Sequence, residues 1–326
     1  MFGRNHLRVY RTLQQSGVPV ALSAIVEADR LRTAALEQEW GVPVYTSTEA
    51  CLADFQSGKI QINAASVCVP TVAHFQIASA LLSVGIDALI EKPIAASLEE
   101  ADRLTTLADR HQRILQVGHL ERFNPAVTAA HSQLNVPMFF EAHRLSVFSP
   151  RSLDVDVVLD LMIHDLDIVL TFAQSPVSQV HAVGLPILSP KVDIANVRVE
   201  FESGCVANFT ASRVSTERVR KLRFFQPHQY VSIDYARQDL LIINVAAKSA
   251  DQSLESISAG LGIQKPQIAP GEPLRLEIES FLESVRSRRQ PVVSGRDGSA
   301  ALKLALEINA AIAEHSRRAG LDRYTA

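Results

Sequence analysis

A carboxylate, a histidine and a second carboxylate lie at helical spacing in one of the most apolar stretches of the chain, between Val155 and Leu170. Asp160, His164 and Asp167 follow one another at spacings of four and three residues, which stacks them on one face of a helix. Because nearly all their neighbours are apolar, this helix is expected to be largely buried, where unpaired charges are costly. A carboxylate one turn before a histidine can fix the tautomer of the imidazole and make it more basic. The segment predicts a general base; the alternative is a buried helix whose Asp and His only satisfy each other.

A second chemical feature ends the short apolar strand expected at 86–91. Pro93 favours an extended conformation at Lys92 and prevents the strand from continuing as a central ladder. Lys92 would then project from the carboxyl end of a strand, the edge at which open α/β sheets bind ligands. A lysine at a strand end is usually only solvated, so the tripeptide Glu91-Lys92-Pro93 alone is a weak signal of a site. Together with the Asp-His helix it becomes a strong one.

The combination of Glu91-Lys92-Pro93 with Asp160-x3-His164-x2-Asp167 resembles the motif pair of the Gfo/Idh/MocA family, which contains nicotinamide-dependent sugar and polyol dehydrogenases. The resemblance covers nearly the whole chain. It includes Val69-Pro70-Thr71-x2-His74, the segment Gly118-His119-Leu120-Glu121-Arg122-Phe123-Asn124-Pro125, and Glu277-x3-Phe281 leading to Gly295-x2-Gly298. Met162 stands where the family often has glycine, and its side chain is expected to narrow the pocket without removing the chemistry.

The resemblance implies oxidation of a secondary alcohol, in which hydride leaves the carbon for NAD while a base takes the hydroxyl proton. His164 would take the proton, Asp160 would orient His164, and the Lys92 ammonium would stabilise the developing alkoxide. Whether Lys92 or His164 is the formal base stays open. Asp167 would hydrogen-bond the substrate or serve only as a structural partner on its helix.

The resemblance also implies a set of cofactor-binding residues: Gly3, Glu27, Pro70, Thr71, His74, Glu91 and Lys92. Glu27 follows the apolar segment 18–26, and a carboxylate there accepts hydrogen bonds from ribose hydroxyls and repels a 2′-phosphate. NAD is therefore favoured over NADP, although Arg30 and Arg32 leave NADP as an alternative. His74 would line the nicotinamide or ribose pocket, or only begin a helix.

The resemblance breaks at the amino terminus, where the first Rossmann strand and the first two glycines of the Gly-x-Gly-x-x-Gly turn are absent. Gly3 matches the last glycine. A start codon placed too far downstream, or a truncated record, explains this more simply than a natural protein without its central strand. We expect the chain as written to begin directly in a helix. Its sheet should have a gap or unpaired edge between strands at 19–26 and 64–69, and NAD binding should be weak or absent.

Composition limits the class of protein. A length of 326 residues fits about two domains, and the net charge of −3 argues against a nucleic-acid binder. The amino terminus lacks the apolar core of a signal peptide, and no run approaches the roughly 18 apolar residues of a membrane span. The three cysteines are widely spaced without Cys-x-x-Cys, which indicates reduced residues of a cytoplasmic protein and no metal site.

The order of expected elements gives the fold class. Helices alternate with strands in the first part of the chain, which predicts a Rossmann-like, doubly wound parallel sheet in a domain at 1–120. The expected helices are 4–16, 29–40, 48–56, 72–84 and 97–111, and the expected strands are 19–26, 64–69, 86–91 and 113–117. After the helix near 155–173, strands follow strands: 138–148, 178–187, 194–202, 205–212, 220–226, 229–235 and 239–245. A long loop at 248–273 and helices at 274–288 and 298–318 complete a second domain at 121–326, of α+β type with a mostly antiparallel sheet.

The substrate is expected to carry phosphate. Five cations lie within eleven residues from Arg213 to Arg223, with Arg122 and Arg144 near the domain junction. Arginine suits bidentate phosphate recognition; charges that guard a strand or face solvent are the alternative. Several segments resemble the branch of the family that oxidises nucleotide-linked amino sugars, such as UDP-N-acetylglucosamine 3-dehydrogenases. The implied substrate-binding residues are Lys92, Arg122, Asn124, Asp160, His164, Asp167 and Arg213; inositol or free-hexose oxidation is the alternative within the family.

Two further expectations concern assembly and class. Lys92, Asp160 and His164 should converge on one crevice between the domains. Apolar and polar residues alternate in 197–201 and 206–210, so these strands present two sheet faces. The few helices of the domain can cover only one of them, and a homodimer or homotetramer through the open face is therefore expected. Neither a nucleic acid nor a membrane is expected as a partner. The competing class is a non-catalytic regulator that senses NAD, which would not need the Lys-Asp-His set.

Overall fold

The computed structural model of the protein describes residues 2–149, 155–245 and 261–321. The chain forms two compact units, one of Met1–Gly118 with Leu274–Ser299 and one of His119–Pro273 with Ala300–Ala326. The sequence analysis placed 274–299 in the second domain; the structure packs this segment in the first unit. Each unit is described by itself below.

The first unit alternates helices with short parallel strands. In chain order its elements are α1 (Gly3–Gln15), β1 (Ile25–Val26), α2 (Arg30–Trp40), β2 (Val44–Tyr45), α3 (Thr48–Gln56), β3 (Ala64–Val67), the 3₁₀ helix η1 (Thr71–Ala73), α4 (His74–Ser83), β4 (Asp87–Glu91), α5 (Leu98–His111), β5 (Leu115–Gly118), α9 (Pro273–Ser287) and the start of α10 (Gly295–Ala319). Helices α3 and α5 begin at Ser47 and Ser97, whose side chains accept backbone N–H groups of the first turn. The alternation of helices with parallel strands confirms the fold class predicted for the first domain.

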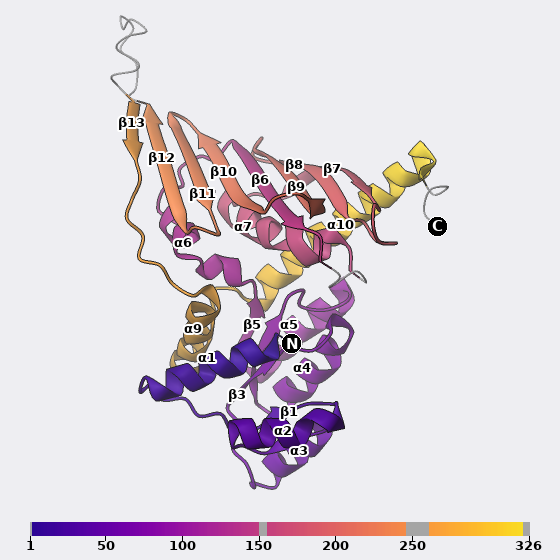
Figure 1. Ribbon diagram of the computed structural model, residues 1–326, viewed down its shortest axis with the longest axis vertical. Coiled ribbons are helices and arrows are strands. Elements are labelled where there is room, and N and C mark those ends of the chain that lie inside the picture. The colour runs from indigo at the N-terminus through magenta and orange to yellow at the C-terminus, as the bar shows by residue number, and fades with distance from the viewer. Residues whose placement is uncertain (1, 150–154, 246–260, 322–326) are drawn as a thin grey trace, which may run out of the picture. The chain divides into compact units, whose positions relative to one another are not determined.

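The parallel strands form two separate sheets (Figure 1). Strands β3, β4 and β5 pair in that order, whereas β1 pairs only with β2. The expected gap between the strands at 19–26 and 64–69 is therefore confirmed, and so is the expected helix at the start of the chain. The predicted strand 19–26 is wrong in length, because only Ile25–Val26 finds a partner strand among the described residues.

Three interactions explain why 274–299 belongs to the first unit. Leu274, Ile278 and Phe281 of α9 share an apolar cluster with Val9 and Leu13 of α1 and Leu89 of β4. The guanidinium of Arg288 donates to the buried carboxylate of Asp87, at 3.1 Å from Oδ1. Gly298 packs so closely on Val117 that a Cβ at position 298 would lie 2.6 Å from Val117 Cγ2. These contacts depend on the fold and leave no local mark in the sequence.

The second unit contains a large sheet with helices on one face. Its elements are the 3₁₀ helix η2 (Leu120–Phe123), α6 (Pro125–His131), β6 (Phe139–Val147), the π-helix η3 (Val158–Met162), α7 (Ile163–Ala173), β7 (Val177–Leu185), β8 (Ile194–Phe201), β9 (Val206–Ser215), β10 (Val219–Gln226), β11 (Gln229–Asp234), β12 (Asp239–Val245), β13 (Leu261–Gln264) and the rest of α10. The strand order is β13-β12-β11-β10-β6-β9-β8-β7, and the pairing is antiparallel except between β6 and β9. The predicted α+β class with a mostly antiparallel sheet is confirmed.

Helices α6, α7 and α10 cover one face of this sheet (Figure 1). Side chains alternate along each strand, so Phe140 and Phe224 enter the core beneath α7 while Phe139 and Phe225 face the opposite side. Met162 is 1% exposed in the same core, so the expectation that it narrows a pocket is wrong. Its side chain belongs to the apolar cluster formed by the sheet and the helices that cover it.

Two differences from the predicted elements remain in this unit. Strand β13 pairs with β12 inside the segment 248–273, which the sequence analysis expected to be a loop throughout; residues 248–260 lie outside the described residues. Helix α6 was not expected, although Asn124 and Pro125 are typical of a helix start. Across the described residues, no helix combines the length and apolarity needed to cross a membrane.

Candidate functional site

The carboxyl ends of β3, β4 and β5 lie in register at one edge of the first unit's sheet. Ile90 pairs with both Val67 and Val117, and Glu91 pairs with Gly118. Lys92 follows directly after β4 and is half-buried. A side chain at Gly118 would clash, since its Cβ would lie 3.0 Å from the Glu91 carboxyl group. The structure therefore places Lys92 at a strand-end edge that glycine keeps open.

His74 lies beside this edge and is almost completely buried, with 1% exposure. Its Nδ1 lies 2.9 Å from the carbonyl oxygen of Pro93, and its Nε2 lies 3.0 Å from that of Val69. The imidazole thus links the loop that carries Pro70 and Thr71 to the residue after Lys92. This geometry gives His74 a positioning role at the start of α4; its contact with nicotinamide stays a prediction.

A chain of hydrogen bonds connects α1 to Glu91. The Tyr10 hydroxyl lies 2.8 Å from Ser66 Oγ, which lies 3.2 Å from His6 Nδ1. His6 Nε2 lies 2.9 Å from Glu91 Oε1, and His6 is 2% exposed. Burial raises the pKa of Tyr10, so its hydroxyl keeps its proton for this chain. These contacts hold the residue next to Lys92, and sequence reasoning missed His6, Tyr10 and Ser66 because they belong to two distant elements.

Cys68 joins this group from the end of β3. The ligand atoms of His6, Cys68 and Glu91 all lie within 4.8 Å of one another, a geometry that a metal ion could use. However, both ring nitrogens of His6 already take part in hydrogen bonds, and burial raises the pKa of the Cys68 thiol. The arrangement fits a structural hydrogen-bonded cluster, and no metal enters the function proposed below.

Gly3 and Glu27, two of the predicted cofactor-binding residues, have positions that fit the adenosine half of NAD. Helix α1 begins at Gly3, and Phe2 at its N-cap supplies no side-chain cap, so backbone N–H groups of the first turn point outward from the helix start. Glu27 directly follows β1, and its carboxylate also accepts the Asp29 N–H at 3.0 Å. A helix start suits a phosphate and a carboxylate at this strand end suits ribose hydroxyls.

In the second unit, Asp160 and His164 are held by a capped π-turn. Asp160 lies in η3 and His164 in α7, and both side chains are partly exposed. The carboxylate of Asp156 accepts the N–H groups of Val158 and Leu159, each at 2.9 Å, and also an N–H of Asn309 at 3.1 Å. Such π-turns are rare and are frequent at functional sites. Asp156 thereby ties the start of η3, which leads into α7, to α10.

Asp167 differs from the other two predicted residues of this segment in exposure. It is 1% exposed, whereas Asp160 and His164 are partly exposed. Its carboxylate accepts two hydrogen bonds from the Arg122 guanidinium, at 2.7 and 2.9 Å. This bidentate pair favours the structural alternative for Asp167; direct substrate contact by Asp167 or Arg122 stays a prediction.

A second buried arginine holds the residue after His164. Arg144 donates to Asp165 at 2.7 and 3.0 Å and to Glu121 at 3.2 Å, and all three are at most 5% exposed. Burial alone would lower the pKa of Arg144, but the charge and hydrogen bonds of Asp165 outweigh it and raise the pKa. The Tyr235 ring packs against Arg144, and burial raises the pKa of its hydroxyl well above the ordinary value.

The sequence analysis considered Arg144 for phosphate and missed Asp165 and Glu121. A signal existed, because an apolar helix with three acidic residues needs buried cations as partners. His119 was also missed. It is 1% exposed, and its ring meets the His164 ring edge to face with centroids 6.3 Å apart.

Two other predicted substrate residues have structural partners. Asn124 is 1% exposed; its Oδ1 caps α6 by accepting the Ala126 N–H at 3.1 Å, and its Nδ2 donates to the Tyr235 carbonyl at 3.0 Å. Arg213 is 5% exposed and lies 3.6 Å from the Asp193 carboxylate. Direct contact of Asn124 or Arg213 with substrate stays a prediction.

Asp193 organises the loop between β7 and β8. Its buried carboxylate accepts the backbone N–H groups of Ile187, Leu188 and Ser189 at 2.6–2.9 Å. Burial would raise the pKa of Asp193, but these hydrogen bonds hold it below the ordinary value. Because Val157 N–H donates to the Val192 carbonyl at 2.9 Å, the ordered loop also supports the segment that leads into η3.

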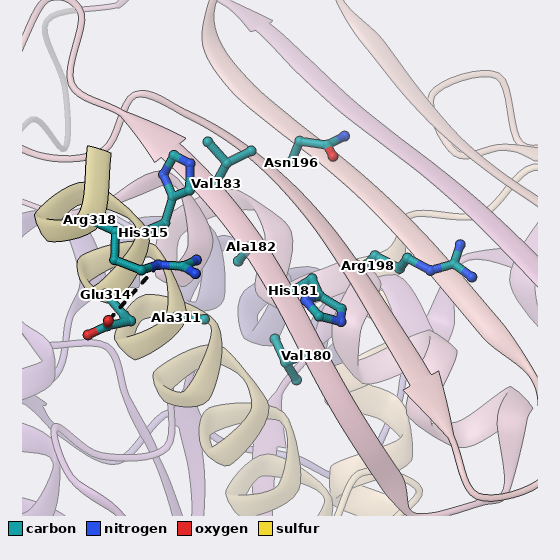
Figure 2. A pocket seen from close by; sticks show the side chains of 10 residues that line it. All are labelled: Val180, His181, Ala182, Val183, Asn196, Arg198, Ala311, Glu314, His315 and Arg318. Carbon is teal, nitrogen blue, oxygen red and sulfur yellow. Dashed lines mark ion pairs between the residues drawn. The ribbon is translucent and has the colours of Figure 1, made fainter. Parts of the chain in front are cut away.

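A hollow of about 460 Å³ lies beside the edge strand β7, and Figure 2 shows the side chains that line it. It is lined by residues of β7, β8 and the carboxy-terminal part of α10, among them His181, Arg198 and His315. None of the predicted site residues lines it. Arg318 in this hollow lies 4.0 Å from Glu314, so part of its charge is already compensated. We therefore do not place the substrate in this hollow.

Comparisons with known proteins agree with this arrangement. Residues 1–119 match a family model described as an oxidoreductase family with an NAD-binding Rossmann fold, and residues 126–226 match a GFO/IDH/MocA C-terminal domain. A UDP-N-acetylglucosamine 3-dehydrogenase from Acidithiobacillus ferrooxidans is 32% identical over 95% of this chain and 94% of its own. Its crystal structure superposes with a TM-score of 0.85, covering 96% of this chain and 94% of that one.

More distant relatives share the fold. A scyllo-inositol 2-dehydrogenase (NAD(+)) from Bacillus subtilis is 24% identical over 75% of this chain and 74% of its own. The structure of an Agrobacterium radiobacter oxidoreductase, in complex with NAD+, L-tartaric acid and magnesium, has a TM-score of 0.80 at 14% identity. It covers 96% of this chain and 93% of that one.

Proposed function

Because the chain belongs to the Gfo/Idh/MocA family of NAD-binding oxidoreductases, we propose that it oxidises a secondary hydroxyl group of a nucleotide-linked amino sugar. The observation that carries the choice of substrate is the 32% identity, over 95% of the chain, with a UDP-N-acetylglucosamine 3-dehydrogenase. The Lys92, Asp160 and His164 set supports a catalytic protein over a regulator that only senses NAD.

The proposed chemistry assigns one task to each of these residues. His164 takes the hydroxyl proton while the carbon becomes a carbonyl, and Asp160 orients the imidazole. The Lys92 ammonium stabilises the negative charge that develops on the oxygen. NAD, held through Gly3, Glu27, Pro70, Thr71 and the Lys92 region, supplies the acceptor for the hydride. The proposal requires Lys92 of the first unit and His164 of the second to reach the same hydroxyl group.

A substrate panel tests this proposal. At NAD concentrations high enough to offset the weak binding expected from the interrupted glycine turn, the purified protein should reduce NAD in the presence of UDP-N-acetylglucosamine. Reduction should be much slower with free N-acetylglucosamine or myo-inositol, because the free sugars lack the nucleotide. The measurement is the absorbance of NADH, with NADP as the comparison cofactor. Faster turnover of inositol or a free hexose would favour the alternative within the family. NAD binding without turnover of any sugar would instead support a non-catalytic regulator.

We further propose a homodimer or homotetramer assembled through the open face of the large sheet. On this face Phe139, Phe225 and Tyr230 form a row with ring centroids 5.5 and 5.1 Å apart, and Phe225 is 36% exposed. The described helices of the unit that join its core, α6, α7 and α10, lie on the other face. Exposed aromatic clusters of this kind favour association.

Multi-angle light scattering checks the assembly. The expected mass at micromolar concentration is that of a dimer or tetramer, and Phe225→Glu should shift it to the monomer by placing a charge in the interface. As a control, Val292→Glu alters an exposed apolar residue of the first unit and should leave the mass unchanged. A wild-type monomer under these conditions would contradict the proposal.

A cytoplasmic location fits the cysteines. Cys51, Cys68 and Cys205 are all free thiols. Burial raises the pKa of each thiol, that of Cys205 to about 11, which keeps them unreactive. Free thiols are the state maintained by a reducing compartment, and this supports the location we propose.

A further inference from the structure

The structure separates the five cations between Arg213 and Arg223 into two groups. Three have carboxylate partners: Arg213 with Asp193, Lys221 with Asp234 and Arg223 with Glu141. For the remaining two, Arg218 and Arg220, no carboxylate lies within ion-pair distance in the part of the chain that the structure describes. An arginine cluster that looks uniform in the sequence thus contains two cations that form no ion pair among the described residues.

Arg220 shares a sheet face with the catalytic helix. Successive side chains of a strand point to opposite faces, so Arg220 lies on the same face as Leu222 and Phe224. Both of these are fully buried, and the Phe224 ring lies 5.9 Å from the ring of Phe172 on α7. Lys221 and Arg223 belong to the opposite, open face. Of these cations on β10, only Arg220 therefore faces the side of the sheet that carries α7.

The neighbour of Arg220 on this face is Arg144. The two residues pair directly across β10 and β6. Arg144 is already engaged with Asp165, next to His164, and with Glu121. Partial burial lowers the pKa of Arg220, and the charges of Arg144 and Arg218 act in the same direction, opposed by those of Glu121 and Asp165. Both carboxylates already accept hydrogen bonds from Arg144. Arg220 is accessible at its surface, so it can bind an added anion.

We propose that Arg220, with Arg218 beside it, binds the diphosphate group of the substrate. The inference rests on the proposed function, because only a nucleotide-linked sugar carries this group. A guanidinium binds phosphate oxygens with two parallel hydrogen bonds, which an ammonium cannot match. In this proposal the diphosphate lies on the sheet face that carries α7. It is next to Arg144, which holds Asp165, the residue after His164.

Calorimetric titration with UDP, without NAD, tests the subsite directly. Arg220→Ala should weaken UDP binding by about 10- to 100-fold, the usual effect of losing a charged hydrogen-bond partner. Arg220→Lys should recover part of the loss. Arg317→Ala removes the same charge from the exposed surface of α10 in the same unit and should change affinity by no more than about threefold. Uridine, which lacks phosphate, should bind wild type and Arg220→Ala equally.

The outcomes separate the subsite from the proposed function. Equal UDP affinity in wild type and Arg220→Ala, or no UDP binding by the wild type, would overturn the subsite. If the wild type oxidises UDP-N-acetylglucosamine and Arg220→Ala has an unchanged KM, the function stands and the subsite is wrong. If UDP binding depends on Arg220 but no nucleotide sugar is oxidised, the subsite stands and the proposed function is wrong. Circular dichroism of each variant confirms that it is folded.

Discussion

Replacing His164 by alanine is expected to lower kcat by about two to four orders of magnitude, the usual contribution of a general base. Without the imidazole, the hydroxyl proton has no acceptor while the carbonyl forms. The KM for the sugar should change much less, because the proton moves only in the transition state. Steady-state kinetics with UDP-N-acetylglucosamine and NAD measure both parameters.

Two comparisons keep this prediction specific. Added imidazole should restore part of the turnover of His164→Ala, which a purely structural role would not allow. His111→Ala removes a partly exposed histidine at the end of α5 and should leave kcat unchanged. Near-normal turnover of His164→Ala would show that His164 only supports its helix, and Lys92 would then be the better candidate for the base.

The second large effect concerns stability. Arg144→Met should lower the free energy of unfolding by about 3–5 kcal/mol, because Asp165 and Glu121 would remain buried without their cation. These carboxylates are 2% and 5% exposed, so water cannot easily replace the guanidinium. Urea denaturation followed by circular dichroism measures the loss, and an unchanged slope would show that the extent of unfolding is the same.

A matched surface variant and a triple variant complete the test. Arg223→Ala breaks an ion pair with Glu141 in which both side chains are about one-third exposed, and it should cost no more than about 1 kcal/mol. Arg144→Met combined with Asp165→Leu and Glu121→Leu should recover much of the stability, since no buried charge is left unpaired. A loss below about 1 kcal/mol for Arg144→Met alone would mean that the two carboxylates are solvated in the variant.

Local patterns were sufficient for most of the elements and for the family. The alternation of apolar and polar residues predicted strands β6 to β12 of the large sheet to within a few residues, and 239–245 matched β12 throughout. Helix 48–56 matched α3, where Ser47 supplies the cap. Such features depend on neighbours in the chain, with periods of two or 3.6 residues, and they can be recognised without coordinates. The strand-end position of Lys92 followed from Pro93 in the same way.

The gap in the parallel sheet was also predictable from sequence. The amino-terminal segment matches the Gly-x-Gly-x-x-Gly motif only at Gly3, and the separate β1–β2 and β3–β4–β5 sheets correspond to this interrupted match. The short length of β1 was not predictable. Apolar residues at 19–24 have the composition of a strand, but a strand needs a partner, and pairing is a property of the assembled sheet.

The tertiary structure alone decided the role of each charge. In the sequence, Arg122, Arg144 and Arg213 are equivalent cations. In the structure, Arg122 meets Asp167 across 45 residues of chain and Arg144 meets Asp165 across 21, so both serve the helix that carries His164. Arg220 stays accessible on the face of the sheet that carries that helix. The physical reason is that a salt bridge depends on the distance between two side chains in space. That distance is set by strand register and helix packing, neither of which any local pattern records.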